Sequence, residues 1–203
     1  MGPTDKSRWG YANSKVTDEF LAMAYYQETR LPVVIVRLFN TVGPRQTGQY
    51  GMLIPNFVSQ ALRGLPITVY GGGEQTRCFI HVRDVVPALA ELVTRPAAFG
   101  NVFNLGSNRE VSVGKLAEMV VKATDSRSEM VKVPYSEAYP PGFEDTQRKV
   151  PDITKVTSMI GFRPGRTLED ILADVIEEQS SHLQAKTSSN GMNREFSTSS
   201  AAD

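Results

Sequence analysis

The sequence Val33-Val-Ile-Val-Arg-Leu-Phe39 is a nearly uninterrupted run of β-branched and apolar residues. A run of this kind, without alternation of polar and apolar side chains, predicts a strand that is buried on both faces of a parallel sheet. The polar loop Asn40-Thr-Val-Gly-Pro-Arg45 follows it. In open α/β sheets, ligands bind at the carboxyl ends of the strands. The run therefore predicts an α/β fold with a ligand site near Asn40.

The segment before this strand predicts a helix that begins near Tyr11. It should end near Arg30, because Pro32 lacks a backbone donor and disfavours helix in front of it. One helical turn separates Tyr11 from Lys15, so we expect their side chains on the same face. The apolar residues that recur at helical spacing are Val16, Phe20, Met23 and Ala24.

A tyrosine and a lysine on one helical face have a chemical use. A fixed ammonium close to a phenol favours the phenolate, which makes the tyrosine a better general base. The long lysine side chain can also reach the ribose hydroxyls of a nucleotide and orient it for hydride transfer. The alternative is an ordinary helix start, because Tyr-x-x-x-Lys is a weak pattern that often arises by chance.

After the Asn40 loop, strands and helices alternate. Asp84, Ser112 and a capping box of Thr167 with Asp170 are predicted to start three of the helices. Beyond Ser180 the chain is rich in Ser, Thr and Asn with few apolar residues, which predicts disorder. The periodicity predicts helices over residues 53–62, 85–93, 113–123, 153–160 and 168–179, and strands over 67–70, 79–82, 101–106 and 131–134.

Charge and composition exclude several classes of partner. Lys and Arg total 22, as do Asp and Glu, and no basic cluster occurs, so neither nucleic acid nor membrane is an expected partner. No apolar run reaches the roughly 18 residues of a membrane span. The N-terminus lacks the apolar region of a signal peptide. The single cysteine, Cys78, excludes an internal disulfide framework. By elimination we expect a cytoplasmic location, and we predict no metal site.

Six short motifs, in this order, carry a resemblance to a known family. Each is modest alone, but their order and spacing are specific over roughly residues 8 to 178. They are Tyr11-Ala-Asn-Ser-Lys15, Arg37-Leu-Phe-Asn-Thr-Val-Gly-Pro44, Val69-Tyr-Gly71, Arg77-x-Phe-Ile-His-Val-x-Asp84, Asn104-Leu-Gly106 and Asp152-Ile-Thr-Lys155. The chain resembles the C-terminal part of an extended short-chain dehydrogenase/reductase, in the group of NAD-dependent nucleotide-sugar epimerases and dehydratases.

The resemblance implies the C-terminal part of an extended Rossmann-type doubly wound sheet and a small α/β substrate-binding lobe. Residues 1–45 would be a remnant of the NAD-binding domain that carries the Tyr11 helix. Residues 46–179 would be mostly the substrate lobe with returning Rossmann elements, and residues 180–203 a disordered tail. The glycine-rich turn and the catalytic Ser or Thr that family members carry before the tyrosine do not occur here. We therefore expect a fragment that is inactive alone.

The resemblance also assigns roles to individual residues. Tyr11 would be the catalytic base and Lys15 its partner, and both would contact the NAD cofactor together with Phe39. The residues expected to bind the nucleotide-sugar are Asn40 for the sugar nucleotide, Arg77 for its diphosphate, Leu53, Thr68 and Phe79 as pocket lining, and Asp145 and Arg148 as the rest of a substrate clamp.

Simpler roles are available for several of these residues. Arg77 could be a solvated turn residue, and the Asn40 amide could bond its own backbone. Asp145 and Arg148 could form a surface pair with each other. Two further motif residues, His81 and Asp84, are expected to be structural.

The activity implied by the resemblance is that of a UDP-glucose 4-epimerase, acting on a UDP-sugar through transient hydride transfer. Decarboxylation is an alternative, because Arg8-Trp-Gly-Tyr11 and Gln147-Arg-Lys-Val-Pro-Asp152 resemble UDP-glucuronate decarboxylases. A relative of dTDP-glucose 4,6-dehydratase is another, and a non-catalytic sugar-nucleotide-binding or dimerisation module a third. Family members commonly pair through the first helix, so we expect a homodimer for the intact protein.

Overall fold

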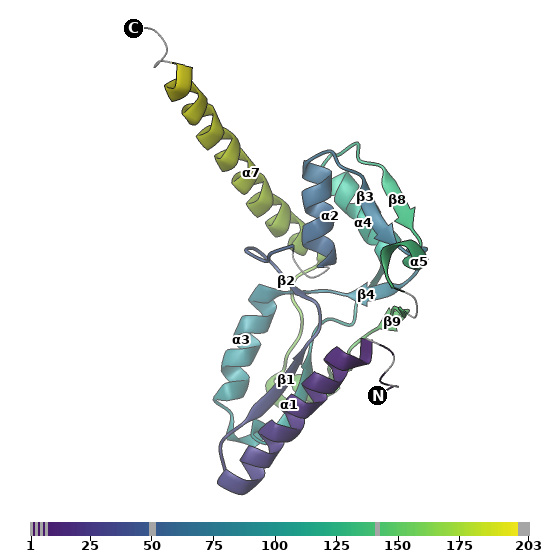
Figure 1. The fold of residues 1–203 in the computed structure, drawn as a ribbon. Coiled ribbons are helices and arrows are strands. Elements are labelled where there is room, and N and C mark those ends of the chain that lie inside the picture. The colour runs from purple at the N-terminus through teal and green to yellow at the C-terminus, as the bar shows by residue number, and fades with distance from the viewer. Residues whose placement is uncertain are drawn as a thin grey trace.

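The computed structural model describes residues 2, 4, 6, 8–48, 52–140 and 143–198, with Arg8 and residues 186–198 described by their backbone alone. Helices and strands alternate along the chain (Figure 1). In chain order the elements are α1 (Arg8–Thr29), β1 (Val34–Leu38), β2 (Thr41–Val42), α2 (Leu53–Leu62), β3 (Ile67–Tyr70), β4 (Thr76–Cys78), β5 (Ile80–His81), α3 (Val82–Val93), a 3₁₀ turn (Pro96–Ala98), β6 (Asn101–Leu105), β7 (Glu110–Ser112), α4 (Val113–Ala123), β8 (Met130–Val133), α5 (Tyr135–Ala138), β9 (Arg148–Lys149), α6 (Thr154–Ile160) and α7 (Leu168–Thr198).

Parallel pairing joins strands that are distant in the sequence. β1 pairs with β6, β2 with β5, and β3 with β8, all in parallel. β4 lies between β7, which is antiparallel to it, and β9, which is parallel. Parallel neighbours require crossover connections, and helices supply them here. The predicted α/β class is therefore confirmed.

Strand β1 is less buried than its sequence predicts. Among the described residues, β6 is the only strand that pairs with it. Helix α1 is held to β1 by Arg37, which donates to both carboxylate oxygens of Glu19 at 2.6 Å. Residues 34–36 are half-buried, and Leu38 is 51% exposed. The prediction of burial on both faces is wrong for this strand: Val34 and Val36 pack against the core that includes Leu92 and Phe103, but they stay half-buried, and β6 is the one described strand beside them.

The larger of the two hydrophobic cores is built on α2, β3, α4 and the first turns of α7 (Figure 1). Its largest buried side chains include Ile54, Phe57, Ile67, Leu116 and Leu172. Each large apolar side chain that is fully buried contributes roughly 1.5–3 kcal/mol to stability. A second core, with Leu92, Phe103 and Val156 at its centre, joins α3 and α6 to β6.

Two predicted helix starts are confirmed by their hydrogen bonds. The Ser112 hydroxyl accepts from the backbone N–H of Lys115 at 3.1 Å and caps α4. At the start of α7, the Thr167 backbone N–H donates to Asp170 at 2.7 Å, and the Asp170 N–H donates back to the Thr167 hydroxyl at 3.2 Å. These reciprocal bonds form the predicted capping box.

The predicted start of α3 is wrong. The helix begins at Val82, and its cap is His81, whose Nδ1 accepts from the backbone N–H of Arg83 at 3.0 Å. Asp84 instead lies in the first turn. It accepts from the backbone N–H and from Nη1 of Arg166, both at 3.0 Å, and so ties α3 to the loop before α7.

Helix α7 continues to Thr198, past Ser180, where the composition predicts disorder. Ser181 donates within the helix to the carbonyl of Glu177 at 2.9 Å. Ser, Thr and Asn weaken a helix without breaking it as proline does, which allows the helix to run on. Residues 199–203 of the predicted tail lie outside the described residues, and the domain boundaries at 45 and 179 stay predictions. In the described part of the chain, no helix is long and apolar enough to cross a membrane.

Candidate functional site

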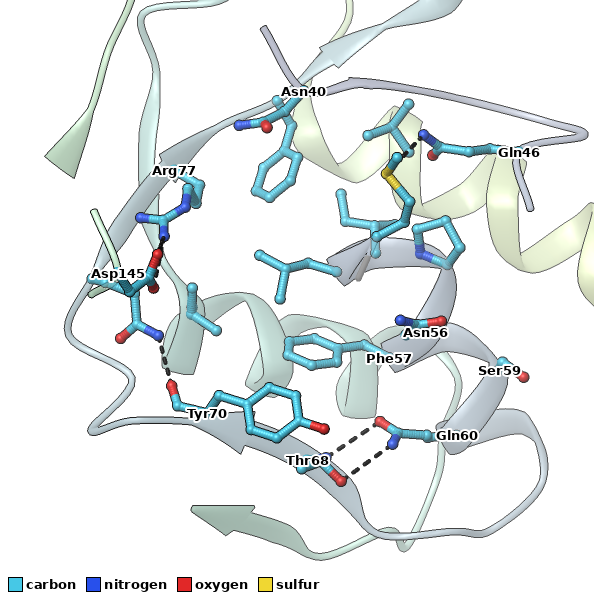
Figure 2. A pocket seen from close by; sticks show the side chains of 18 of the residues that line it. Asn40, Gln46, Asn56, Phe57, Ser59, Gln60, Thr68, Tyr70, Arg77 and Asp145 are labelled. Atoms are coloured by element: carbon cyan, nitrogen blue, oxygen red, sulfur yellow. Dashed lines mark hydrogen bonds and ion pairs between the residues drawn. The ribbon is translucent and has the colours of Figure 1, made fainter. Parts of the chain in front are cut away.

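A cavity of roughly 400 Å³ is lined by residues of α2, of β3 and of the segment that follows β8 (Figure 2). Helix α2 supplies one wall, to which it contributes apolar residues such as Phe57 and polar residues such as Asn56 and Gln60. The loop after β1 and the strand β4 close the other side. Of the nucleotide-sugar residues predicted from the sequence, those that line the cavity are Asn40, Leu53, Thr68, Arg77, Phe79 and Asp145.

Asn40 is held in place by a bond across the site. It follows the end of β1 with φ 36°, a conformation that asparagine tolerates better than most residues. Its side-chain Nδ2 donates to the carbonyl of Cys78 at 2.7 Å. The alternative in which Asn40 bonds its own backbone is therefore wrong. The bond ties the β1 loop to β4 and keeps the amide at the cavity wall.

Arg77 and Asp145 form a half-buried ion pair at one end of the cavity (Figure 2). Arg77 Nη2 donates to both oxygens of Asp145, at 2.8 and 2.9 Å, and Nη1 donates to the carbonyls of Thr76 and Thr146, at 2.8 and 2.6 Å. The Arg77 side chain is only 13% exposed. The alternative of a solvated turn residue is therefore wrong.

Tyr135 belongs to the same network. Its hydroxyl donates to Asp145 Oδ2 at 2.6 Å. Burial, together with this bond to a carboxylate, raises the pKa of the Tyr135 phenol far above its ordinary value. Tyr135 is therefore a fixed neutral donor, which is how it orients the carboxylate.

Arg148 is not part of the cavity wall. It lies in β9, opposite Thr76 of β4, and donates from Nε and Nη2 to the carboxylate of Glu110 at 3.0 and 2.6 Å. These bonds, with one from the Thr76 hydroxyl at 2.8 Å, lower the pKa of Glu110. The alternative of an Asp145–Arg148 pair is wrong, because each residue has a different partner.

Aromatic residues missed by the sequence analysis form a wall of the cavity. Tyr139 and Phe143 stack with ring centroids 3.8 Å apart, and Tyr70 meets Tyr139 edge-on at 5.5 Å. A wall of this kind suits a flat ring. The available signal was the density of aromatic residues between 135 and 143, but that segment has no periodicity, and residues 141 and 142 lie outside the described part of the chain.

Polar groups converge on the cavity from α2, β2 and β3. Gln60 and Thr68 exchange two bonds, at 3.3 and 3.2 Å (Figure 2). Gln46 donates from Nε2 to the carbonyl of Thr41 at 3.1 Å. The buried Oε1 of Gln46 and hydroxyl of Thr41 have no hydrogen-bond partner among the described residues. Unsatisfied buried polar atoms at a cavity are available to a polar ligand.

Tyr11, Lys15 and Phe39 do not line this cavity. Tyr11 is 74% exposed, and the Lys15 ammonium lies 5.9 Å from the centroid of its ring, on the same face as predicted. Lys15 also bonds Asp18 at 2.9 Å, which raises its pKa. Phe39 lies under the ammonium of Lys149, 5.5 Å from its ring centroid.

The remaining motif residues have structural contacts. His81 is fully buried, and because its Nδ1 accepts from a backbone N–H, its Nε2 carries the proton and donates to Asp174 at 3.0 Å. Burial raises the pKa of the Cys78 thiol, which is the mark of a core residue and not of a nucleophile. No group of metal-ligating side chains occurs in the described residues.

Comparison with known proteins places the chain in a family. The model of the GDP-mannose 4,6 dehydratase family matches residues 3–175. A UDP-N-acetyl-alpha-D-glucosaminuronate decarboxylase of Bacillus cytotoxicus is 40% identical over 177 residues, which are 87% of this chain and 54% of the relative. UDP-glucuronic acid decarboxylase 4 of Arabidopsis thaliana is 36% identical over 83% of this chain and 36% of its own length. The chain thus belongs to the family of NAD-dependent nucleotide-sugar epimerases and dehydratases.

Solved structures agree with this assignment. UDP-glucose 4-epimerase of Thermotoga maritima, solved with UDP-glucose, matches with a TM-score of 0.77 at 28% identity, over 85% of this chain and 54% of its own. UDP-glucuronic acid 4-epimerase of Bacillus cereus, solved with UDP-glucuronic acid and NAD, matches with a TM-score of 0.74 at 26% identity, over 84% and 52%. The Rossmann-type α/β fold is thereby confirmed, and the chain spans about half the length of these structures.

Proposed function

We propose that this chain carries the sugar-nucleotide site of an NAD-dependent enzyme that acts on a UDP-sugar through transient hydride transfer. The observation that carries the proposal is the cavity of roughly 400 Å³ with a half-buried arginine at one end and an aromatic wall beside it. A guanidinium fork suits phosphate oxygens, and an aromatic wall suits a nucleobase. The relatives named above, whose names specify UDP-sugars, support the same ligand class.

In this proposal the ligand lies along the cavity. Arg77 binds the diphosphate, with Asp145 beside it. Thr68, together with Leu53 and Phe79, contacts the nucleoside, and Asn40 orients the sugar end next to the β1 loop. Arg148 lies in β9 and bonds Glu110. In this proposal it does not bind the ligand, and its role is to support β4 next to Arg77.

Tyr11 and Lys15 are the proposed catalytic pair, and with Phe39 they are the proposed contacts to NAD. Tyr11 Oη takes the proton from the sugar hydroxyl that is oxidised and later returns it. Lys15 holds a ribose hydroxyl and keeps the phenol beside a positive charge. NAD, when bound, accepts and returns the hydride.

Two reactions at the sugar remain candidates. The epimerase activity predicted from the sequence is supported by the epimerases among the solved structures. Decarboxylation is supported by the 40% identity with a decarboxylase that acts, by its name, on a UDP-linked uronate. For the intact protein we also propose a homodimer through α1, whose residues Phe20 and Tyr25 are 71% and 59% exposed.

Calorimetric titration of the purified chain with UDP, and separately with NAD, tests the site. We expect UDP to bind and NAD to bind weakly or not at all, because the cavity residues are enclosed whereas Tyr11 and Lys15 are open. Arg77→Ala should weaken UDP binding by at least about 10-fold, the value of a charge-assisted hydrogen bond. Arg95→Ala is the matched control, since Arg95 is also ion-paired but lies between α3 and the 3₁₀ turn, outside the cavity. UDP binding that is insensitive to Arg77→Ala would refute the assignment.

A further inference from the structure

The Arg77–Asp145 pair is engaged by contacts within the protein. Both terminal nitrogens of Arg77 donate, Nη2 to the two oxygens of Asp145 and Nη1 to the carbonyls of Thr76 and Thr146. Among the described residues, none accepts a hydrogen bond from Nε. Asp145 accepts four bonds, two from Arg77, one from Tyr135 at 2.6 Å and one from the Thr146 backbone N–H at 2.7 Å. A carboxylate has about four such positions, so this one is full.

The charges of the cavity cancel in the same way. Among the described residues that line it, Arg77 is the only cation and Asp145 the only anion. A phosphate group that approaches Arg77 finds both terminal nitrogens engaged and a carboxylate in the position that its own oxygens would take. Two anions cannot share one guanidinium edge without repulsion.

We propose that Asp145 is an internal anionic ligand of Arg77, which holds the phosphate position and must be displaced before a diphosphate can bind. The inference rests on the proposed function, since it concerns the same Arg77. The network from Tyr135 and Thr146 orients the carboxylate toward the guanidinium. An anion can therefore bind Arg77 only if it binds more tightly than the Asp145 carboxylate that it displaces. A bare phosphate compound gains only the Arg77 contact, whereas a nucleoside diphosphate gains the cavity walls as well. Asp145 is therefore a determinant of specificity for anions attached to a nucleoside.

The test is the affinity of the full chain for pyrophosphate and for UDP, with and without the competing charge. Asp145→Asn keeps the size of the side chain and removes its charge. We expect it to bind pyrophosphate and UDP at least about 10-fold more tightly than the wild type, because one charge-assisted contact no longer competes. The larger gain should be for pyrophosphate, which has no other contacts.

Glu144→Gln is the matched control. Glu144 is the preceding residue, pairs with Lys6 at 3.5 Å, and does not line the cavity, so its substitution makes the same change in net charge. We expect its affinities to stay within about twofold of the wild type, in line with the small effect of an exposed charge pair. Adding Arg77→Ala to Asp145→Asn should abolish the gain, which a general charge effect would not do.

The outcomes separate this inference from the proposed function. If UDP binds in an Arg77-dependent way but Asp145→Asn is no tighter than Glu144→Gln, the inference fails and the proposed function stands. If neither ligand binds the wild type or the Asp145 variant, both fail. Should Asp145→Asn lose its cooperative melt, Asp145→Ser removes the same charge and leaves a hydroxyl for Tyr135, and the same comparison then applies.

Discussion

Helices α2 and α1 both carry apolar residues at helical spacing but have opposite surroundings. In α2, Ile54, Pro55, Phe57, Val58 and Ala61 are buried. In α1, no residue whose side chain is described is buried, although the helix is more than twice as long. The apolar stripe of α2 lies on a core that β3, α4 and α7 complete, whereas α1 meets β1 and little else. Helical periodicity thus predicts a helix in both regions, and tertiary packing decides which helix contributes stability.

The largest expected effect comes from substituting one phenylalanine in each helix. Phe57→Ala should lower the free energy of unfolding by about 3–5 kcal/mol, because Phe57 is 2% exposed and its removal leaves a cavity in the core. Phe20→Ala should change it by less than about 0.5 kcal/mol, since Phe20 is 71% exposed. Urea unfolding of both variants measures the difference. Equal effects would mean that α1 is packed as firmly as α2.

A smaller effect is expected on self-association. Exposed apolar side chains that gather on one helix indicate a contact surface. Phe20→Asp should weaken association of the chain by at least about 10-fold, as measured by sedimentation equilibrium, because it places a charge in the proposed contact. Val86→Asp, on α3, is the control, since Val86 is also an exposed apolar residue, at 57%. A wild-type chain that is monomeric at all concentrations would contradict the proposed dimer.

The same contrast shows which parts of the site the sequence could predict. Leu53 and Thr68 belong to periodic elements, so their placement on a cavity wall follows from local pattern. Tyr135 and Tyr139 follow β8 in a segment without periodicity, and their contacts depend on the path that the chain takes over the cavity. The partner of Arg148 could not be predicted from local pattern either. It is set by the pairing of β4 with both β9 and β7, which brings Glu110 close to Arg148 from 38 residues away.

The smallest predicted effect concerns how α1 is held to β1. The bonds from Arg37 lower the pKa of Glu19 below its ordinary value of 4.5. A carboxyl whose pKa is lower in the folded state stabilises that state above the unfolded pKa, and this contribution is lost as the pH falls through the folded pKa. Because Arg37 is half-exposed, the contribution should be below about 1 kcal/mol.

Amide hydrogen exchange in α1 should therefore be faster in Glu19→Gln than in the wild type at neutral pH, and the difference should vanish in acid. Glu28→Gln, on the same helix, should leave the exchange of α1 unchanged at every pH. If amide exchange in α1 is the same in both variants, the Glu19–Arg37 pair does not hold the helix. The contact between α1 and β1 then rests on the half-buried apolar side chains of α1 alone.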